Sequence, residues 1–411
     1  SSMSPFSQGR YDLHMSWVEH AIWWHVYPLG LCGAPIREPD TAPGPRLRRL
    51  LGWLDYAIEL GCSGLLLGPI FDSVSHGYDT LDHFAIDPRL GDADDFDRLV
   101  AECRARGLNI LLDGVFNHVA ASHPDAARLS RRGEDGAIRS WEGHGGLTAL
   151  DHSNSEVADL VAEVMLHWLR RGIAGWRLDV AYEVPPEFWR EVTGRVRREF
   201  PGVLFLGEMI HGDYSGFVEA SGLDTVTQYE LWKGTWSSIK DRNFWELAWA
   251  LDRHAGMCRG FVPQTFIGNH DVTRIASEVG DDGAVLAATA LFTLPGMPSV
   301  YYGDEQAFQG RKLEGLHADD ELRPPLPASP AELSPAGEWM YRIYQRLIGL
   351  RRRNPWLSRG RLKVIAKENA WIEYRVSGDA PDQDLRVRLA LEPQCSATVM
   401  CGGETAFHWE R

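Results

Sequence analysis

Several signatures of other protein classes are missing from this 411-residue sequence. No apolar run reaches the length of about 18 residues that a transmembrane helix requires. Residues 1–10 lack the basic segment and apolar core of a secretory signal peptide, and Ser1-Ser2 ahead of Met3 resembles the remnant of a tag. There is no internal repeat and no low-complexity tail. We therefore expect a globular, cytoplasmic protein.

Positive charge and cysteine are also scarce. Acidic residues outnumber basic ones, so the net charge is -15. This balance argues against a nucleic-acid or anionic-membrane partner and favours a neutral or cationic ligand. The six cysteines have neither the spacing of a metal site nor the density of a disulfide scaffold. Cys395 and Cys401 could form a disulfide, but we expect free thiols. The oligomeric state is left open.

What is present is an alternation of apolar strands and amphipathic helices, which predicts a parallel α/β sheet. Strands are expected at residues 21–28, 64–71, 108–115, 173–181, 204–208, 223–229, 261–268 and 296–305. Helices are expected at residues 47–60, 95–106, 155–171, 185–200, 243–259 and 337–353. The polar stretch 119–154 is expected to be an excursion, and 312–335 a loop over the site. Four short alternating runs after residue 354 predict an antiparallel β domain.

Four of the apolar strands lead into polar residues at their C-terminal ends. The segments are Asp113–His118 (DGVFNH), Gly175–Ala181 (GWRLDVA), Leu204–Glu208 (LFLGE) and Phe266–Asp271 (FIGNHD). Because side chains alternate along a strand, Arg177 and Asp179 share one face. A structural ion pair would explain those two residues alone. Carboxylates that end three separate strands instead indicate a site on the upper face of a (β/α) barrel.

In order and spacing, these segments resemble the four signature regions of the α-amylase family of retaining glycoside hydrolases. Residues 180–189 are similar to the cyclomaltodextrinase and neopullulanase branch, although the N-terminal domain of that branch has no counterpart in this sequence. The resemblance implies a (β/α)8 TIM barrel formed by residues 1–118 and 155–353. It also implies a short B domain, residues 119–154, between the third strand and third helix, and a small C-terminal β domain, residues 354–411.

The resemblance assigns catalytic roles to three carboxyl groups. Asp179 corresponds to the nucleophile, Glu208 to the acid/base, and Asp271 to the third carboxylate, which holds sugar hydroxyls. Retaining glycosidases need two carboxyl groups close together, one of them protonated at rest. Clustering of carboxylates raises a carboxyl pKa, so this arrangement can supply the proton.

The same resemblance suggests residues that bind the sugar. Tyr78 corresponds to a tyrosine on which a sugar stacks, although on its own it could equally be a packing residue. His118 and His270 correspond to histidines that hydrogen-bond sugar hydroxyls, and Arg177 would orient Asp179. The histidines without a motif context are expected to be structural: His25, His83 and His144.

Two further expectations concern the rim of the site. Asp79 resembles an aspartate that blocks the pocket beyond the first sugar, and Arg323 is the nearest match to its arginine partner. Three tryptophans expected in loops, Trp141, Trp232 and Trp236, could line further subsites.

No cofactor and no metal are expected. Asn117 matches an asparagine that binds calcium in many members of the family, but residues 119–154 offer no partner aspartate. A metal hydrolase is not favoured either, because no His-x-His or clustered ligand set is present.

The function that the resemblance implies is hydrolysis of α-1,4-glucosidic bonds in malto-oligosaccharides, linear or cyclic, through a covalent glycosyl-enzyme intermediate. Two alternatives stay open. One is an α-glucan transglycosylase or isomerase that uses the same residues. The other is a catalytically inactive sugar-binding homologue, although such relatives usually lose a carboxylate and this chain retains all three.

Overall fold

A computed structural model describes residues 19–37, 42–141 and 144–411. The residues on which the leader and tag expectations rest therefore lie outside the described part. Eight parallel strands form the central sheet, in the order β11-β10-β9-β5-β2-β1-β13-β12. Their bounds are β1 Trp23–Val26, β2 Gly64–Leu67, β5 Asn109–Gly114, β9 Gly175–Leu178, β10 Leu204–Gly207, β11 Thr225–Val226, β12 Gln264–Thr265 and β13 Met297–Tyr301.

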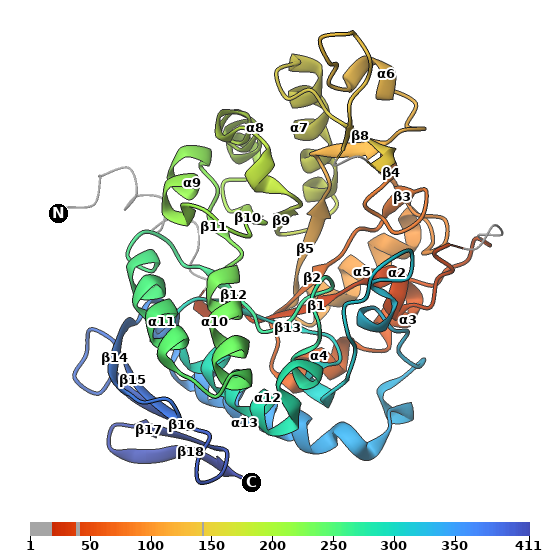
Figure 1. The fold of residues 1–411 in the computed structure, drawn as a ribbon. Coiled ribbons are helices and arrows are strands. Elements are labelled where there is room, and N and C mark those ends of the chain that lie inside the picture. The colour runs from red at the N-terminus through yellow and green to blue at the C-terminus, as the bar shows by residue number, and fades with distance from the viewer. Residues whose placement is uncertain (1–18, 38–41, 142–143) are drawn as a thin grey trace.

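The sheet closes on itself. A parallel bridge pairs Thr227, just beyond β11, with Gln264 of β12, and the amide of Gln228 donates to the carbonyl oxygen of Gln264 at 2.8 Å. The eight strands therefore form the predicted (β/α)8 barrel, with helices around it (Figure 1).

The helices were predicted less completely than the strands. Their bounds are α2 Pro28–Leu31, α3 Arg48–Leu51, α4 Leu54–Leu60, α5 Ala93–Ala105, α6 Ala126–Leu129, α7 Ser155–Arg170, α8 Pro186–Glu199, α9 Tyr214–Ser221, α10 Tyr229–Lys240, α11 Trp245–Met257, α12 Ile275–Thr293 and α13 Glu338–Arg353. The single helix expected at 47–60 is interrupted at Gly52-Trp53 and forms α3 and α4. Helix α10 was not predicted, so Trp232 and Trp236 lie on a helix and not in loops.

Alternation along the strands separates two apolar cores. Inward-facing residues such as Trp23, Leu111 and Leu204 fill the barrel. Outward-facing residues such as Trp24 and Leu178 pack against the helices in a much larger cluster. Buried on both faces, the strands are almost continuously apolar, as parallel strands usually are. A polar side chain pointing into such a barrel therefore indicates a site.

Three smaller sheets surround the barrel. Strands β3 Phe71–Ser73 and β4 Thr80–Ile86 pair in the segment after β2, where the sequence analysis predicted no separate strands. Strands β6 His118–Ala120, β7 Ser140–Trp141 and β8 His144–Ala149 form a sheet within the excursion after β5.

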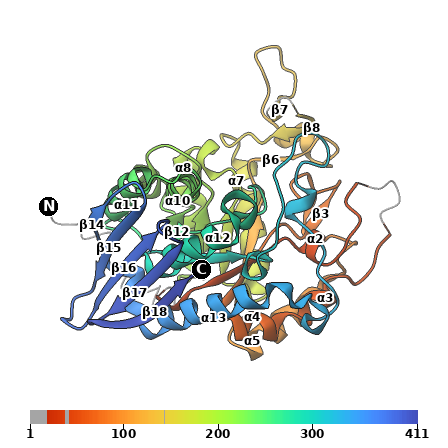
Figure 2. The ribbon, with the colours of Figure 1, turned by 60° about the horizontal axis from the view of Figure 1, so that its bottom comes forward.

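The C-terminal sheet is antiparallel, in the order β14-β15-β16-β17-β18, and packs beside α11, α12 and α13 (Figure 2). Its strands are β14 Arg361–Lys367, β15 Trp371–Ser377, β16 Asp384–Ala390, β17 Ser396–Cys401 and β18 Glu404–Glu410. The last strand was not among the four runs predicted from the sequence. All six cysteines are free, as expected. None of the helices in the described ranges combines the length and apolar content needed to cross a membrane.

Candidate active site

The centre of the site is the guanidinium group of Arg177, at the C-terminal end of β9. It points into the barrel and is 4% exposed. Its Nη1 donates to Asp179 Oδ1 at 3.2 Å, and its Nη2 donates to Glu208 Oε2 at 2.9 Å. The structure thus brings together two of the expected carboxyl groups, from neighbouring strands β9 and β10, on one arginine.

A third carboxylate, Asp113, also contacts this arginine. Arg177 Nη1 donates to Asp113 Oδ1 at 2.8 Å and to Oδ2 at 3.0 Å. The two residues are direct partners in the pairing of β5 with β9. Asp113 begins one of the four signature segments, but no role was predicted for it. Its inward-facing position at the end of an adjacent strand was the available signal.

The turn after Asp179 is strained. Val180 has a φ of 48°, in the left-handed region, which is unfavourable for a β-branched residue by about 1 to 3 kcal/mol. In this conformation the amide of Val180 donates to Glu208 Oε1 at 2.8 Å. The strained conformation of Val180 therefore positions the amide that holds Glu208.

Asp271 lies across the barrel mouth and is the most open of the three expected catalytic residues. Its side chain is 37% exposed, whereas Asp179 and Glu208 are buried. Arg323 Nη2 donates to Asp271 Oδ1 at 2.9 Å, and Arg323 Nε donates to the carbonyl oxygen of His270 at 3.0 Å.

Arg323 does not pair with Asp79, contrary to the expectation. It forms ion pairs with Asp271 and Asp319. The Asp79 carboxylate instead accepts hydrogen bonds from the backbone amide and hydroxyl of Ser75, at 3.1 and 2.5 Å. Arg323 reaches the barrel mouth because the loop that carries it folds over the end of β13, a long-range contact that sequence spacing does not show.

The rings of Tyr78 and His270 stack at the mouth, with centroids 5.6 Å apart and planes 11° from parallel. The Tyr78 hydroxyl also donates to Asp113 Oδ2 at 2.8 Å and lies 2.5 Å from His270 Nε2. Tyr78 is thereby held by the same network as Arg177.

His118 begins the excursion and faces Tyr78. Its Nε2 lies 3.0 Å from the Tyr78 carbonyl oxygen, and the Asn117 amide contacts its Nδ1 at 3.0 Å. Trp141 stacks on it, with ring centroids 5.8 Å apart. The Asn117 side chain is thus engaged with a histidine. Within the described ranges, no three His, Cys, Asp or Glu side chains converge as metal ligands would.

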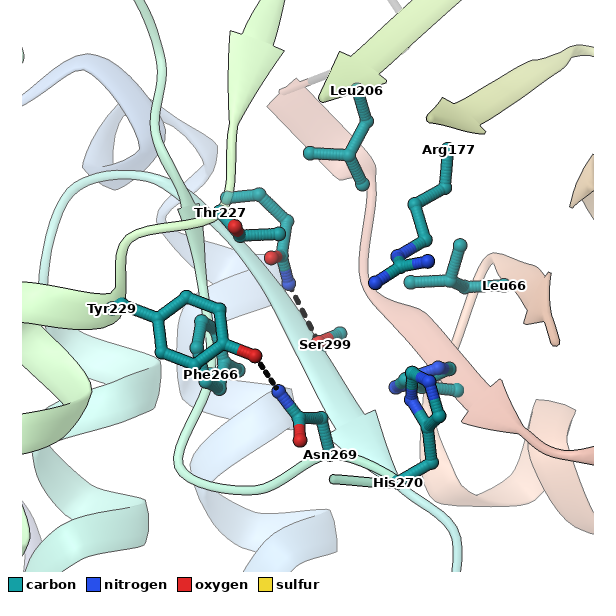
Figure 3. A pocket seen from close by; sticks show the side chains of 11 residues that line it. Leu66, Arg177, Leu206, Thr227, Tyr229, Phe266, Asn269, His270 and Ser299 are labelled. Carbon is teal, nitrogen blue, oxygen red and sulfur yellow. Dashed lines mark hydrogen bonds between the residues drawn. The ribbon is translucent and has the colours of Figure 1, made fainter. Parts of the chain in front are cut away.

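Of the histidines expected to be structural, His25 lies close to the site. Its ring meets the edge of His270 at 5.2 Å. It lines a pocket together with Arg177, Tyr229, Asn269 and His270, which are labelled in Figure 3. His83 packs elsewhere, against Phe71 and Phe116, and the side chain of His144 is outside the described part.

Burial dominates the electrostatics of this centre. It raises the pKa of Asp179 well above its ordinary value, and the charge of Glu208 raises it further. Burial also raises the pKa of Glu208, against the opposing charge of Arg177. Both shifts favour the protonated form of these carboxyl groups.

His118 and His270 are neutral because they, too, are buried. Burial lowers the pKa of His270 well below its ordinary value, assisted by Arg323, and lowers that of His118 to about 4. Neutral imidazoles beside carboxylates suit hydrogen bonding to an uncharged ligand. The arrangement can donate a proton, present a carboxylate nucleophile and hold hydroxyl groups, all within one cluster.

Comparison with known proteins places this arrangement among enzymes of one family. The model of the alpha-amylase catalytic domain matches residues 47–144 and 141–325. Neopullulanase 2 of Thermoactinomyces vulgaris is 30% identical over 393 residues, which cover 84% of this chain and 65% of that protein. Cyclomaltodextrinase of Geobacillus thermopakistaniensis (strain MAS1) is 28% identical, over 88% of this chain and 67% of that one. The chain thus spans about two thirds of the length of these curated relatives.

A solved structure shares the fold. Cyclic alpha-maltosyl-(1→6)-maltose hydrolase from Arthrobacter globiformis, in complex with that sugar, superposes with a TM-score of 0.80 at 24% identity. The match covers 96% of this chain and 99% of the other. At this identity the likeness concerns the fold alone.

Proposed function

This chain belongs to the α-amylase family, and we propose on that basis that it is a retaining hydrolase of α-1,4-glucosidic bonds in malto-oligosaccharides, linear or cyclic. The observation that carries the proposal is the pairing of Asp179 and Glu208 on the single guanidinium group of Arg177. Two carboxyl groups on one guanidinium group are close neighbours, and retaining enzymes need such a pair, at about 5 to 5.5 Å.

In the first step of the proposed reaction, an oxygen of Asp179 attacks the anomeric carbon while Glu208 gives its proton to the glycosidic oxygen. The bond to the leaving sugar breaks and a covalent ester forms. In the second step Glu208 takes a proton from water, which attacks the same carbon. The ester bond breaks, the product keeps its anomeric configuration, and both carboxyl groups return to their starting states.

The other residues are assigned to binding and positioning. Tyr78 supplies a flat surface for the reacting sugar, and His118 and His270 hydrogen-bond its hydroxyl groups.

Asp271, held by Arg323, binds hydroxyls at the open side, and Asp79 limits the depth of the pocket. Arg177 orients Asp179. The proposed reaction needs no metal or cofactor, because carboxyl groups supply both the nucleophile and the proton.

We also propose that the protein works in the cytoplasm. The support is that a relative in Bacillus subtilis, 28% identical over 333 residues, is named intracellular maltogenic amylase. The oligosaccharide is the proposed partner, without nucleic acid or membrane.

A substrate panel separates hydrolysis from its alternatives. Maltose, maltotriose, cyclodextrins, isomaltose, trehalose, sucrose and starch are incubated with the protein and the products are resolved by chromatography. Shorter products from maltotriose and cyclodextrins support the proposal. Products longer than maltotriose would indicate a transglycosylase, and no product from any α-glucan would indicate an inactive homologue.

The two carboxyl roles are distinguished by azide rescue of Asp179→Ala and Glu208→Ala with an α-glycosyl fluoride. Without a nucleophile, azide attacks directly and gives the β-glycosyl azide. Without the acid/base, azide attacks the covalent intermediate and gives the α-glycosyl azide. The opposite pattern of anomers would reverse the two assignments.

A further inference from the structure

Two tryptophans on the outer wall of the barrel are exposed without a structural reason. Trp245 and Trp249, on α11, are 51% and 57% exposed, whereas most other tryptophans in the described ranges are buried or half-buried. They are four residues apart and so share one face of the helix. The opposite face, which includes Leu247 and Leu251, is already buried, and α11 packs against α10 and β14.

Each indole ring is held in place by a cation over one of its faces. Lys367 Nζ lies 5.0 Å from the ring centroid of Trp245, and Arg253 Cζ lies 5.0 Å from that of Trp249. The Trp245 indole nitrogen also donates to Asn369 Oδ1 at 2.9 Å. Arg253 is fixed in turn by an ion pair with Glu230. With one face covered by a cation, each ring can offer its other face to a ligand.

The two rings lie at a junction between domains. Helix α11 packs beside β14, and the turn that follows β14 supplies Asn369, whose carbonyl oxygen accepts from the amide of Phe244 at 3.0 Å. In Figure 1 this junction is on the side of the barrel away from β8 and the excursion. The partners of the two rings, Lys367, Arg253 and Asn369, do not belong to the carboxylate cluster.

We propose that Trp245 and Trp249 form a second binding site for an α-glucan chain, outside the catalytic centre. This inference rests on the proposed function, because it takes the substrate class from it. The apolar faces of sugar rings would stack on the two indoles, and the sugar hydroxyls would reach the polar side chains around them, among them Asn369 and Asp252. Rigid aromatic rings with a polar rim suit a ligand that is apolar on its faces and polar at its edges.

The exposed area argues against a protein partner. Two half-exposed indoles offer on the order of 300 Å² of surface. A stable interface needs about 800 Å² from each partner. The neighbouring side chains are charged, including Asp252, Arg253 and Lys367, whereas the centres of protein interfaces are depleted of such residues.

The test uses gel electrophoresis of the native protein through soluble amylopectin, beside turnover of maltotriose. The variants are Trp245→Ala/Trp249→Ala and, as a matched control, Trp339→Ala, which removes a tryptophan that is 36% exposed on α13. We expect the double variant to lose at least five-fold in affinity for amylopectin, the control to retain it, and all three proteins to turn over maltotriose equally.

Three results would overturn the proposal. In the first, amylopectin does not retard the wild-type protein. In the second, the double variant is retarded as strongly as wild type. In the third, analytical ultracentrifugation shows that wild type is a dimer and that the double variant is a monomer. Failure of the proposed function is recognised separately, as no turnover of maltotriose by any of the proteins, whatever their mobility in amylopectin.

Discussion

At the scale of single residues, the charge of one arginine organises the acidic centre. Arg177 contacts Asp113, Asp179 and Glu208. A buried cation with several carboxylate partners is stable only while those partners stay in place. Asp113 also accepts from Tyr78, so it connects the stacking ring to the arginine that holds the two proposed catalytic groups.

We expect Asp113→Asn to be folded but impaired. Loss of the buried charge should lower the free energy of unfolding by about 3 kcal/mol. Displacement of Arg177 and Tyr78 should lower kcat for maltotriose by roughly 100-fold. Calorimetry and steady-state kinetics measure the two effects. The control is Asp125→Asn, whose carboxylate is 47% exposed. Wild-type kcat in Asp113→Asn would show that the network does not depend on this residue.

The three carboxylates could be predicted from the sequence because each ends a recognisable apolar strand. Asp113 also ends a predicted strand, but its contacts with Arg177 and Tyr78 join separate segments and could not be predicted. The same holds for the pairing of Arg323 with Asp271. Arg323 is 52 residues from Asp271 in the chain, and nothing near either residue indicates that they meet. His25 was predicted to be structural because it belongs to no motif. Alternation along β1 nevertheless turns its side chain inward, toward His270.

At the scale of elements, local signals succeeded where the sequence pattern and the tertiary contacts agree. Helix α5 begins with a capping box, in which Asp92 accepts from the amide of Asp95 and Asp95 accepts from the amide of Asp92. Helix α10 lacks such agreement. Its sequence contains glycine, threonine and two serines, which are weak helix formers, and it is stabilised by packing on α11 and α12.

The cap of α5 gives a prediction at this scale. Asp92→Ala should lower the free energy of unfolding by about 1 kcal/mol, because it removes the acceptor for an orphan amide. Asp94→Ala is the matched control: it removes an exposed carboxylate from the same turn and should cost only a few tenths of that amount. Urea denaturation of the two variants measures the difference. Equal losses would mean that charge, and not the cap, stabilises this end of the helix.

At the scale of the whole molecule, the barrel and the helices around it enclose an ionisable side chain, Glu305, that has no role in the proposed reaction. Glu305 is 2% exposed between β1 and α4, and it accepts from Trp24, Tyr56 and the amide of Gly303. Among the described residues, no lysine or arginine forms an ion pair with it. Burial raises its pKa from 4.5 to about 7.

This shift makes the stability of the fold depend on pH. Between the two pKa values the folded protein keeps a proton that the unfolded chain has released, so the stabilisation is complete at low pH and is lost as the pH rises through about 7. From pH 4.5 to 8, the free energy of unfolding should fall by about 3 kcal/mol more in wild type than in Glu305→Gln. Urea titrations across this range provide the measurement, with Glu332→Gln as an exposed control. Parallel pH profiles for wild type and Glu305→Gln would contradict it.

The central claim is that Asp179 attacks the sugar and becomes covalently bound to it. It is tested most directly by incubating the protein with a 5-fluoro-α-glycosyl fluoride of glucose or maltose, followed by mass spectrometry of the intact protein and its peptides. The account predicts a mass increase of one fluorinated glycosyl group, carried by the peptide that contains Asp179. An adduct on another residue, or turnover without any adduct, would contradict it.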